Sequence, residues 1–534
     1  MMLLQPRARA RAAVHRGSVV VVVVWAVAVA AVLVSATQIV TFRQAVVGRE
    51  TLARVQARWA ARAGVEQMVA IMEFHLQNAD PDDPMAVVRD MEEHATGTTA
   101  TGGWDIRHFL DGIEWAGPLD EGAKLNINTA TRLQLTNLPN MTPDVVDAIL
   151  DWRDADDDVQ QLGAESDYYS NRTLGYKPRN GNFRSFAEIE LVAGAWPQYV
   201  RGEDWNLNGR LDPNENDGNK SFPNDKPDGK LDGGWSKYLT ASSVQSPMSL
   251  SGEDKLPLKG TDAESFTKRL GIDANQAKAL ATYGNQPNAK PENLITTPLS
   301  QLAGASGTGG AGGTGGTGGT GGTGGTGGKP SGGSMGGGRT GGGSGGGGQS
   351  GGGVSVDGGR TSTASGGAGS SRGSGGSSTA PAGGSSGRSS GGQASGGAGG
   401  TAAVTNLTNE QLRAVLRETT ADDFTKPVPG RMNINTVPDS VLKEVLEIDP
   451  RVADAIVARR RAKPEGITSL ADLSEISGMN PTVLSQIAAQ FDVTSSVYTV
   501  TSRGRAATTG AEVEIEAIVD KSQLPAKIIS YREQ

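Results

Sequence analysis

The stretch RARARAAVHRGSVVVVVVWAVAVAAVLVSATQIV, Arg7 to Val40, decides what kind of protein this is. Arginines precede Gly17, and no charged residue occurs from Ser18 to Phe42. At about 1.5 Å per residue, such a run is long enough to cross a hydrocarbon layer of about 30 Å as a helix. The arginine-rich side is expected to stay in the cytoplasm. We therefore predict a single-pass membrane protein whose remaining residues work outside the cytoplasm.

Three interpretations of this stretch are open. A cleaved secretory signal is disfavoured, because apolar residues continue at helical spacing to Leu76, with no proline before Pro81. A plain anchor and a prepilin-type leader fit about equally on this stretch alone. In the second case the leader is cut between Gly17 and Ser18, and the apolar helix stays as the start of the mature protein.

Composition narrows the class of protein. The 534 residues allow about three or four domains. The chain has no Cys, so an exported protein of this kind depends on packing or bound ions rather than disulfides. A net charge of -8 gives no general attraction to nucleic acid or anionic lipid. None of the four His residues has a partner at metal-binding spacing, so we do not expect an enzyme.

A glycine-rich segment, residues 303–402, consists of TGG repeats followed by Gly and Ser. We name it the tether. It has too few apolar residues to bury a core, so a flexible linker is expected. A coil of about 100 such residues spans roughly 55 Å.

Strand patterns occur near both ends of the exported part. WDIRHFL and GIEWAG flank Asp111-Gly112, which is a hairpin turn signal. Alternating segments follow at 497–503 and from Val513, and residues 527–531 could form an edge strand. We predict one antiparallel sheet that packs on the outer half of the long helix, with the middle of the chain as an insertion.

The insertion contains an internal repeat. NINTATRLQLTNLPNMTPDVVDAILDWR from Asn126 aligns without a gap with NINTVPDSVLKEVLEIDPRVADAIVARR from Asn433. SFAEIELVAG from Ser185 also pairs with SLADLSEISG from Ser469. Each copy predicts capped helices joined by turns with Pro at the start of a helix. The pattern resembles the helix-hairpin-helix or SAM-like class.

Such folds often bind nucleic acid, but these hairpins disfavour it. LPNMTP and LEIDP lack the glycines whose N–H groups meet phosphate in binders of this class. Five Asp residues between 151 and 158 would repel phosphate, and only the second copy has a basic cluster, at 459–463. We expect a packing module for protein contacts and no nucleic-acid partner.

After the first copy, DWNLNGRLDPNE has the spacing of an EF-hand-type calcium loop, with Gly209 at the sharp turn. The predicted ligands are Asp204, Asn206, Asn208, Arg210 through its carbonyl, Asp212 and Glu215. Two Asn ligands lower the charge, so we expect weak binding of about 10⁻⁴ to 10⁻³ M. A partial second calcium site would use Asp225, Asp228 and Asp232. Ion-free surface turns are the alternative for both.

These pieces, in this order, resemble the minor pseudopilin K family of the type II secretion system. The matching pieces are the Arg-Gly/Ser junction with its apolar helix, Asp120-Glu121 before LNINTA, AILDWRDADDD, Gly-Ala-Glu with Tyr168-Tyr169, SFAEIELVAG, the second NINT copy and the terminal strands. They cover nearly the whole chain outside the tether.

The resemblance implies an α+β fold, with a pilin-like core and an inserted helical domain of two SAM-like repeats. It also implies cleavage at Gly17-Ser18 by prepilin peptidase and assembly with other minor pseudopilins at the pseudopilus tip. The N-terminus would be cytoplasmic, the helix would lie in the inner membrane, and the ectodomain would be periplasmic. Calcium in the inserted domain is implied as well.

One position fits a tip subunit in particular. Most pilin-type helices carry Glu at the fifth mature position, and counting from Ser18 that position is Val22. A carboxylate within the bilayer is costly unless a neighbour pairs with it. A subunit with no neighbour ahead of it would not need that Glu.

We therefore divide the chain into seven parts. They are a leader (1–17), a membrane helix (18–42), the rest of the helix with the first core strands (43–120), the first repeat with the calcium loop (121–302), the tether, the second repeat (403–490) and the last core strands (491–534). Two alternatives remain open: an anchored helix-hairpin-helix protein in DNA uptake, and a calcium-stabilised adhesion protein with an uncut anchor.

Overall fold

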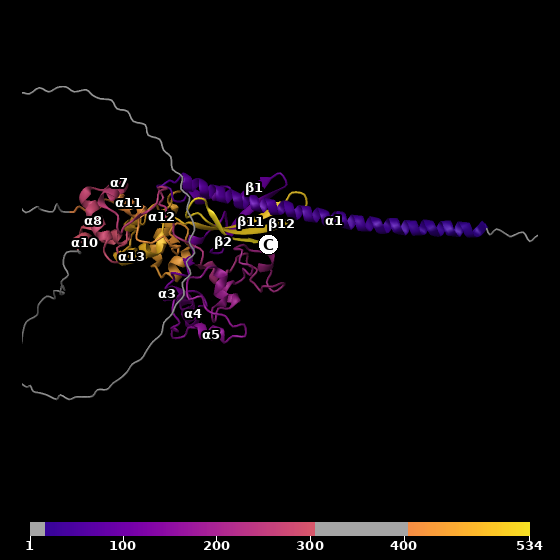
Figure 1. Cartoon of the computed structure of the whole chain (residues 1–534), viewed down its shortest axis with the longest axis horizontal. Helices are drawn as coiled ribbons and strands as arrows, with labels where there is room; N and C mark the ends of the chain where they lie inside the picture. The colour runs from indigo at the N-terminus through magenta and orange to yellow at the C-terminus, as the bar shows by residue number, and fades with distance from the viewer. Residues whose placement is uncertain (1–15, 305–403) are drawn as a thin grey trace, which may run out of the picture. The chain divides into compact units, whose positions relative to one another are not determined.

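The computed structural model describes residues 16–304 and 404–534. The predictions for leader residues 1–15 and for tether residues 305–402 lie outside the described part. The structure of the rest is given in Figure 1.

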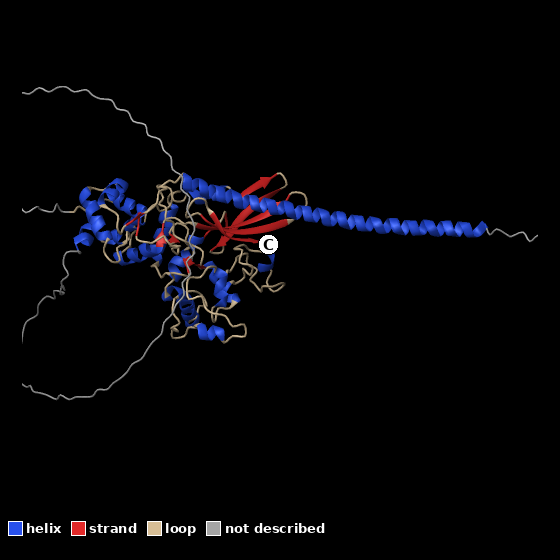
Figure 2. Cartoon of the chain, viewed as in Figure 1, coloured by secondary structure: helices blue, strands red, loops and turns tan. Residues whose placement is uncertain are grey.

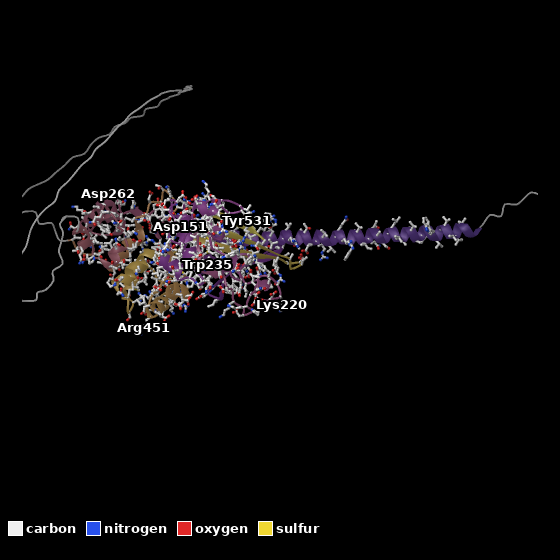
Figure 3. The ribbon with its side chains drawn as sticks, turned by 90° about the horizontal axis from the view of Figure 1, so that it is seen from below. Asp151, Lys220, Trp235, Asp262, Arg451 and Tyr531 are labelled. Atoms are coloured by element: carbon white, nitrogen blue, oxygen red, sulfur yellow. The ribbon has the colours of Figure 1, made fainter. Side chains whose placement is uncertain are left out.

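The helix α1, Arg16–Gln77, contains the apolar stretch. It is the one helix in the described residues that is long and apolar enough to cross a membrane. Gly17 and Ser18 lie in its first turn. Side chains from Val19 to Leu52 are exposed, and in Figure 3 they stand out from a helix with no other element beside it. The second half of α1 packs against the sheet.

The sheet joins strands that precede the inserted repeats with strands that follow them, as predicted. Its order is β1-β2-β11-β12-β13, with β3 beside β2 and β4 beside β11. The strands are β1 (Thr96–Thr99), β2 (Gly102–Leu110), β3 (Ile113–Ala116), β4 (Leu119–Asp120), β11 (Val497–Ala506), β12 (Glu512–Asp520) and β13 (Lys527–Glu533). Each pairing is antiparallel. Figure 1 shows the purple β2 beside the yellow β11 and β12 in one sheet.

Small residues let α1 approach the sheet closely. Ala57 and Ala61 are fully buried on the helix face that meets β11. A Cβ added to Gly504 would lie 2.0 Å from the carbonyl oxygen of Ala57. Farther along, larger residues such as Met68 and Met72 fill the core beneath the strands. The short helix α2, Ala86–Glu93, packs on this end through Val87 and Met91.

The two repeat copies have matching elements. The first contains β5 (Leu125–Asn126), α3 (Arg132–Thr136), α4 (Pro143–Arg153), α5 (Ser166–Ser170), η2 (Phe186–Leu191), α6 (Pro197–Val200) and β6 (Leu239–Thr240). The second contains β9 (Met432–Asn433), η6 (Val441–Val445), α12 (Pro450–Arg461), η7 (Leu470–Glu475), α13 (Pro481–Gln490) and β10 (Phe491–Asp492). Each copy closes with a short parallel pair, β5 with β6 and β9 with β10. Figure 2 shows this inserted part as helices and loops beside the sheet.

The two copies share one hydrophobic core, which runs from Leu125 to Val493. Polar contacts also cross between them. Gln134 Nε2 donates to Gln490 Oε1 at 2.7 Å, and Asn137 Nδ2 donates to the carbonyl of Val445 at 3.1 Å. The copies therefore form one body although the tether separates them in sequence.

A further helical cluster was not foreseen by the two-repeat division. It is built from α7 (Ala263–Leu270), α8 (Ala274–Gly284), α9 (Asn293–Thr296) and α10 (Leu299–Gly304) before the tether, with α11 (Asn409–Glu418) after it. Val415 of α11 is buried in the same core as Phe266 and Leu280. A parallel pair, β7 (Leu256–Pro257) with β8 (Thr419–Thr420), also joins the two sides. The tether thus leaves and re-enters a single cluster.

Candidate functional site

Asp120 and Glu121 lie where the sheet meets both repeat copies, and both are buried. Asp120 accepts a hydrogen bond from Asn433 Nδ2 of the second copy at 2.9 Å. Glu121 accepts from Thr240 Oγ1 of the first copy and from Thr499 Oγ1 of β11 at 2.6 Å. Burial raises the pKa of Asp120 despite its hydrogen bonds. These adjacent acids join the sheet to the inserted domain.

The second Asn of each NINT motif forms the same pair of hydrogen bonds in both copies. Asn128 and the backbone of Phe183 exchange two hydrogen bonds, at 3.1 and 2.7 Å. Asn435 and the backbone of Ile467 exchange the equivalent pair, at 3.0 and 2.8 Å. A buried backbone segment needs such partners when no strand lies beside it. Asn128 and Asn435, the second Asn of each NINT motif, therefore have a role in folding.

The two hairpins share a left-handed residue at the matching position, and neither contains a glycine. Asn140 and Glu447 occupy matching positions, with left-handed φ values of 59° and 52°. Glycine adopts this conformation without steric cost, and its N–H would be open to phosphate. Glu447 instead places a carboxylate on the second hairpin. The expectation of a protein-packing module stays a prediction.

Part of the basic cluster in the second copy is internal. Arg460 donates to the carbonyls of Ile434 at 3.1 Å and Val437 at 2.7 Å, and burial lowers its pKa to about 10. Arg459 pairs with Glu475 at 3.0 Å. These two arginines are thus engaged within the protein.

The first calcium loop forms a compact turn. The Asp204 carboxylate accepts hydrogen bonds from the N–H groups of Asn208 and Gly209, both at 3.0 Å. Gly209 has a left-handed φ of 66°, as the sharp turn of such a loop requires. The N–H of Arg210 donates to Asn208 Oδ1 at 2.7 Å. Asp204 and Asn208 therefore hold the turn around Gly209 by hydrogen bonds to backbone N–H groups, and calcium binding at this turn stays a prediction.

The end of this loop folds back on its start. Asp212 Oδ2 accepts from Asn206 Nδ2 at 2.9 Å and from Asn208 Nδ2 at 3.0 Å. Glu215 accepts from the N–H groups of Trp205 and Asp212, both at 3.1 Å. The six predicted ligand residues therefore belong to one hydrogen-bonded unit.

Burial and mutual repulsion favour a cation in this unit. Burial raises the pKa of Asp204 to about 6. Burial, followed by the charges of Asp204 and Asp212, raises the pKa of Glu215 to about 7. However, no three His, Asp or Glu side chains within residues 16–304 and 404–534 are arranged as a metal-binding group. Asp212 already forms an ion pair within the protein, because Arg503 Nη2 donates to its Oδ1 at 2.6 Å.

The same loop is attached to the sheet. The carbonyl of Gly209 accepts from the N–H of Phe109 in β2 at 2.7 Å. The carbonyl of Asn208 accepts from Thr501 Oγ1 in β11 at 3.0 Å. An ion that made this loop more rigid would therefore also make the contact between the inserted domain and the sheet more rigid.

The residues predicted for a second calcium site cap separate turns. Asp225, Asp228 and Asp232 accept backbone hydrogen bonds from Gly218, Lys230 and Gly234, at 2.8, 2.9 and 3.2 Å respectively. Glu203, which the loop spacing did not predict as a ligand, is buried beside Asp232. It accepts from the N–H groups of Lys226 at 2.9 Å and Asp232 at 3.2 Å. Burial raises its pKa, and the Asp232 charge adds to the effect.

A second acidic group lies near the end of α4, where the sequence predicted only repulsion of phosphate. Asp151 is fully buried, and Glu165 is 3% exposed. Both Glu165 oxygens and Asp154 Oδ1 are buried without a hydrogen-bond partner. Asp151 is labelled in Figure 3 among the packed side chains. The i, i+3 spacing of Asp151 and Asp154 at a helix end was the available sequence signal.

Comparison with known proteins gives two family matches. Residues 123–202 match the family described as type II secretion system (T2SS), protein K. Residues 430–492 match the helix-hairpin-helix motif. No curated protein matches the chain.

One similar solved structure is the crystal structure of the GspK-GspI-GspJ complex from the enterotoxigenic Escherichia coli type 2 secretion system. The identity is 9%, and the alignment covers 91% of this chain and 99% of that chain, with a TM-score of 0.38. Residues 123–202 are thus similar to the protein K family of the type II secretion system, and they lie in an insertion within a core made of one long apolar helix and an antiparallel sheet.

Proposed function

We propose that the protein is a minor pseudopilin of a type II secretion system, a structural subunit that takes part in protein export across the outer membrane. One observation carries the proposal: the protein K match lies in an insertion between β4 and β11 of a helix-and-sheet core. Such a subunit acts by packing. Its apolar helix would lie in the inner membrane before assembly and in the filament core afterwards.

A position at the filament tip is supported by Val22. This residue is exposed on α1 at the place where pilin-type helices commonly carry Glu. Neighbouring subunits below it could still pack on the apolar helix. A subunit that caps and primes the filament would have no neighbour ahead, so it would not need a carboxylate to pair with that neighbour's terminal amine.

The experiment is N-terminal sequencing of the membrane-extracted protein, combined with co-purification of the other minor pseudopilins. We expect a start at Ser18 and a stable complex. Gly17→Leu should block processing by prepilin peptidase, and Gly48→Ala serves as a control on the same helix, where an added Cβ meets nothing within 4 Å. An intact leader on the assembled protein, or a soluble ectodomain that has lost the helix, would refute the proposal.

Calcium binding belongs to the proposal as well. The ligands would be Asp204, Asn206, Asn208, the Arg210 carbonyl, Asp212 and Glu215, as predicted for the loop 204–215. The raised pKa values of Asp204 and Glu215 and the left-handed Gly209 support it. The case for Asp225, Asp228 and Asp232 is weaker, because these side chains cap separate turns. Millimolar Ca²⁺ should raise the melting temperature, and Asp204→Asn should reduce that shift.

The helix-hairpin-helix match raises DNA binding as a second function. The carboxylate at Glu447 and the internal role of Arg460 argue against it. We expect no salt-dependent binding of duplex DNA by the purified protein. Binding whose affinity falls steeply with salt concentration would instead favour a role in DNA uptake.

A further inference from the structure

A cavity of about 190 Å³ lies where the end of α1 meets the helical cluster, the second repeat copy and the end of β12. Its volume is more than ten times the roughly 10–15 Å³ that one buried water needs, so it can hold a group of several non-hydrogen atoms. Its lining comes from segments far apart in sequence, among them 75–87, 243–255, 413–422 and 491–497. The loop 204–215 contributes nothing to it.

Lys521, which directly follows β12, places an ammonium group in the lining of this cavity. In the described residues no carboxylate forms an ion pair with it, and the centre of the Tyr498 ring lies 5.9 Å away, near the outer limit of a cation–π contact. Burial lowers the pKa of Lys521 to about 8, although the charges of Asp120 and Asp520 act in the opposite direction. The ammonium is therefore charged at neutral pH and lacks a paired anion.

The other Lys and Arg side chains of the lining already have acidic partners. These pairs are Lys255 with Asp492 at 3.9 Å, Arg413 with Asp472 at 2.6 Å, Arg417 with Glu418 at 2.7 Å, and Arg431 with Glu292. Within residues 16–304 and 404–534, Lys521 is thus the one lysine or arginine of the lining without such a partner. An anion that entered the cavity would find its counter-charge there.

Backbone hydrogen bonds fix the surroundings of Lys521. Its N–H donates to the carbonyl of Ser496 at 2.7 Å. Ser246 Oγ donates to the carbonyl of Ser522 at 3.0 Å, and it accepts from the N–H of Met248 at 3.0 Å. The loop that carries Met248 therefore lies beside Lys521, so an apolar wall and the ammonium border the same space.

The rest of the lining combines apolar side chains with a small excess of negative charge. The lining contains six Asp and Glu side chains against five Lys and Arg. A doubly charged anion such as phosphate would be repelled, whereas a single negative charge matches the single unpaired ammonium. The apolar side chains favour a ligand whose remaining surface is apolar. They include Leu76, Val244, Met248, Leu416, Phe491 and Val497.

We propose that this cavity binds an apolar carboxylate, whose charged group pairs with Lys521 and whose apolar part lies against Met248 and Val497. A charge-assisted hydrogen bond in a partly desolvated site is stronger than a neutral one, and burial of the apolar part adds to the affinity. Two sources share this chemistry: a free organic acid and the C-terminal residue of a peptide. A cavity with mostly apolar walls and one placed charge is typical of a small-molecule site.

A bound carboxylate would connect parts of the fold that are distant in sequence. The end of α1, α11 after the tether and the segment next to β12 all line the cavity. Occupation should therefore stabilise the helical cluster against the helix-and-sheet core. The inference does not rest on the proposed role in export, because a chain with any role could bind the same group.

The test is isothermal titration calorimetry of the full-length protein in phosphatidylcholine nanodiscs, which avoid detergent micelles. The probes are N-acetyl-leucine, its uncharged amide and inorganic phosphate. We expect N-acetyl-leucine to bind with a Kd of about 1 mM or lower, and the amide and phosphate to bind at least about tenfold more weakly. Hexanoate and N-acetyl-glycyl-leucine then distinguish the sources: tighter binding of hexanoate indicates a free acid, and tighter binding of the dipeptide indicates a peptide terminus.

Two variants make the test specific to the ammonium. Lys521→Met removes the charge but keeps a long side chain, and it should weaken the binding of N-acetyl-leucine at least about tenfold. Lys527→Met, at an exposed lysine of β13, is the matched control and should bind like wild type. Because Lys521→Met removes a charge without a paired anion, it should melt no lower than wild type in the absence of ligand.

The inference is overturned if the amide or phosphate binds as tightly as N-acetyl-leucine, if Lys521→Met binds like wild type, or if no carboxylate binds at about 10 mM. The comparison of acid with amide uses the wild-type protein, so it decides the matter even if Lys521→Met does not fold. A negative result would leave co-purification with other pseudopilins, the test of the proposed function, unaffected.

Discussion

Gly504→Ala should separate α1 from the sheet, because the change places one methyl group between a strand and a helix backbone. Gly504 lies in β11 and pairs with Trp104 and Val513 on either side. Its φ is not in the left-handed region, so backbone strain at the glycine itself is not the issue. The limitation is space: an added Cβ would lie 2.0 Å from Ala57 O and 2.3 Å from Ala61 N.

The magnitude follows from the atoms involved. Carbon atoms normally stay more than 3 Å from such neighbours, so α1 and β11 must move apart by about 1 Å, and no rotamer change can relieve a clash with backbone. Overpacking of a well-packed core typically costs about 1–3 kcal/mol. We expect the upper end, about 3 kcal/mol, or roughly 10 °C in the melting temperature of the helix-and-sheet core.

Differential scanning calorimetry of the detergent-solubilised full chain measures this shift. Gly48→Ala is the matched control, since its Cβ meets nothing within 4 Å and Ala favours a helix. Adding Ala57→Gly should not rescue Gly504→Ala, because the clash involves the backbone oxygen of residue 57 rather than its methyl group. Rescue by Ala57→Gly, or a shift no larger than that of Gly48→Ala, would refute the reasoning.

Three further outcomes are expected. Replacing the Asp120 carboxylate by Asp120→Asn should destabilise the chain by about 1–3 kcal/mol in urea unfolding, since a buried acceptor is exchanged for a donor beside Asn433. Glu165 and Glu215 have pKa values raised to about 7, so the folded state binds protons more tightly than the unfolded state. In EDTA, the contribution of these two carboxyl groups to stability should therefore be fully present below about pH 4.5 and be lost as the pH rises through about 7; the variant Glu165→Gln/Glu215→Gln should gain stability relative to wild type over this range in urea unfolding, and a difference that does not change with pH would contradict this. Deleting residues 305–403 with a connector of about 10 residues should raise the melting temperature by a few degrees, because Ser300 Oγ and Asn406 Oδ1 already lie 2.7 Å apart and closing the shorter loop costs about 2 kcal/mol less; a drop would show that the tether contributes to folding.

Local patterns were enough to predict the long apolar helix, the hairpin at Asp111-Gly112 and the paired NINT copies. Each depends on residues close in sequence: an uncharged run, a turn dipeptide whose two residues both adopt positive φ, and capped helices. The shared sheet followed from alternation at both ends of the chain. The winding of the loop 204–215 was also local, because its backbone N–H groups bind side chains a few residues away.

The helical cluster around Phe266 could not be predicted in the same way. Its core includes Val415, which follows the tether in sequence. The local sequence pattern on either side of the tether does not indicate that the two segments pack together. The environment of Glu165 is likewise long-range, since it depends on the end of α4 and on Asn180 in a separate loop. The sequence alone does not show whether a carboxylate is exposed to solvent or buried without a hydrogen-bond partner.

By itself, the sequence determined the membrane-length helix, the repeat and the order of the ligand-type residues, because periodicity, caps and turns act over a few residues. Only the tertiary structure decided that the two copies share a core, that Asp120 and Glu121 join them to the sheet, and which carboxylates lack a partner. The physical reason is that burial and hydrogen-bond pairing depend on chain segments that are distant in sequence and meet only when the chain folds.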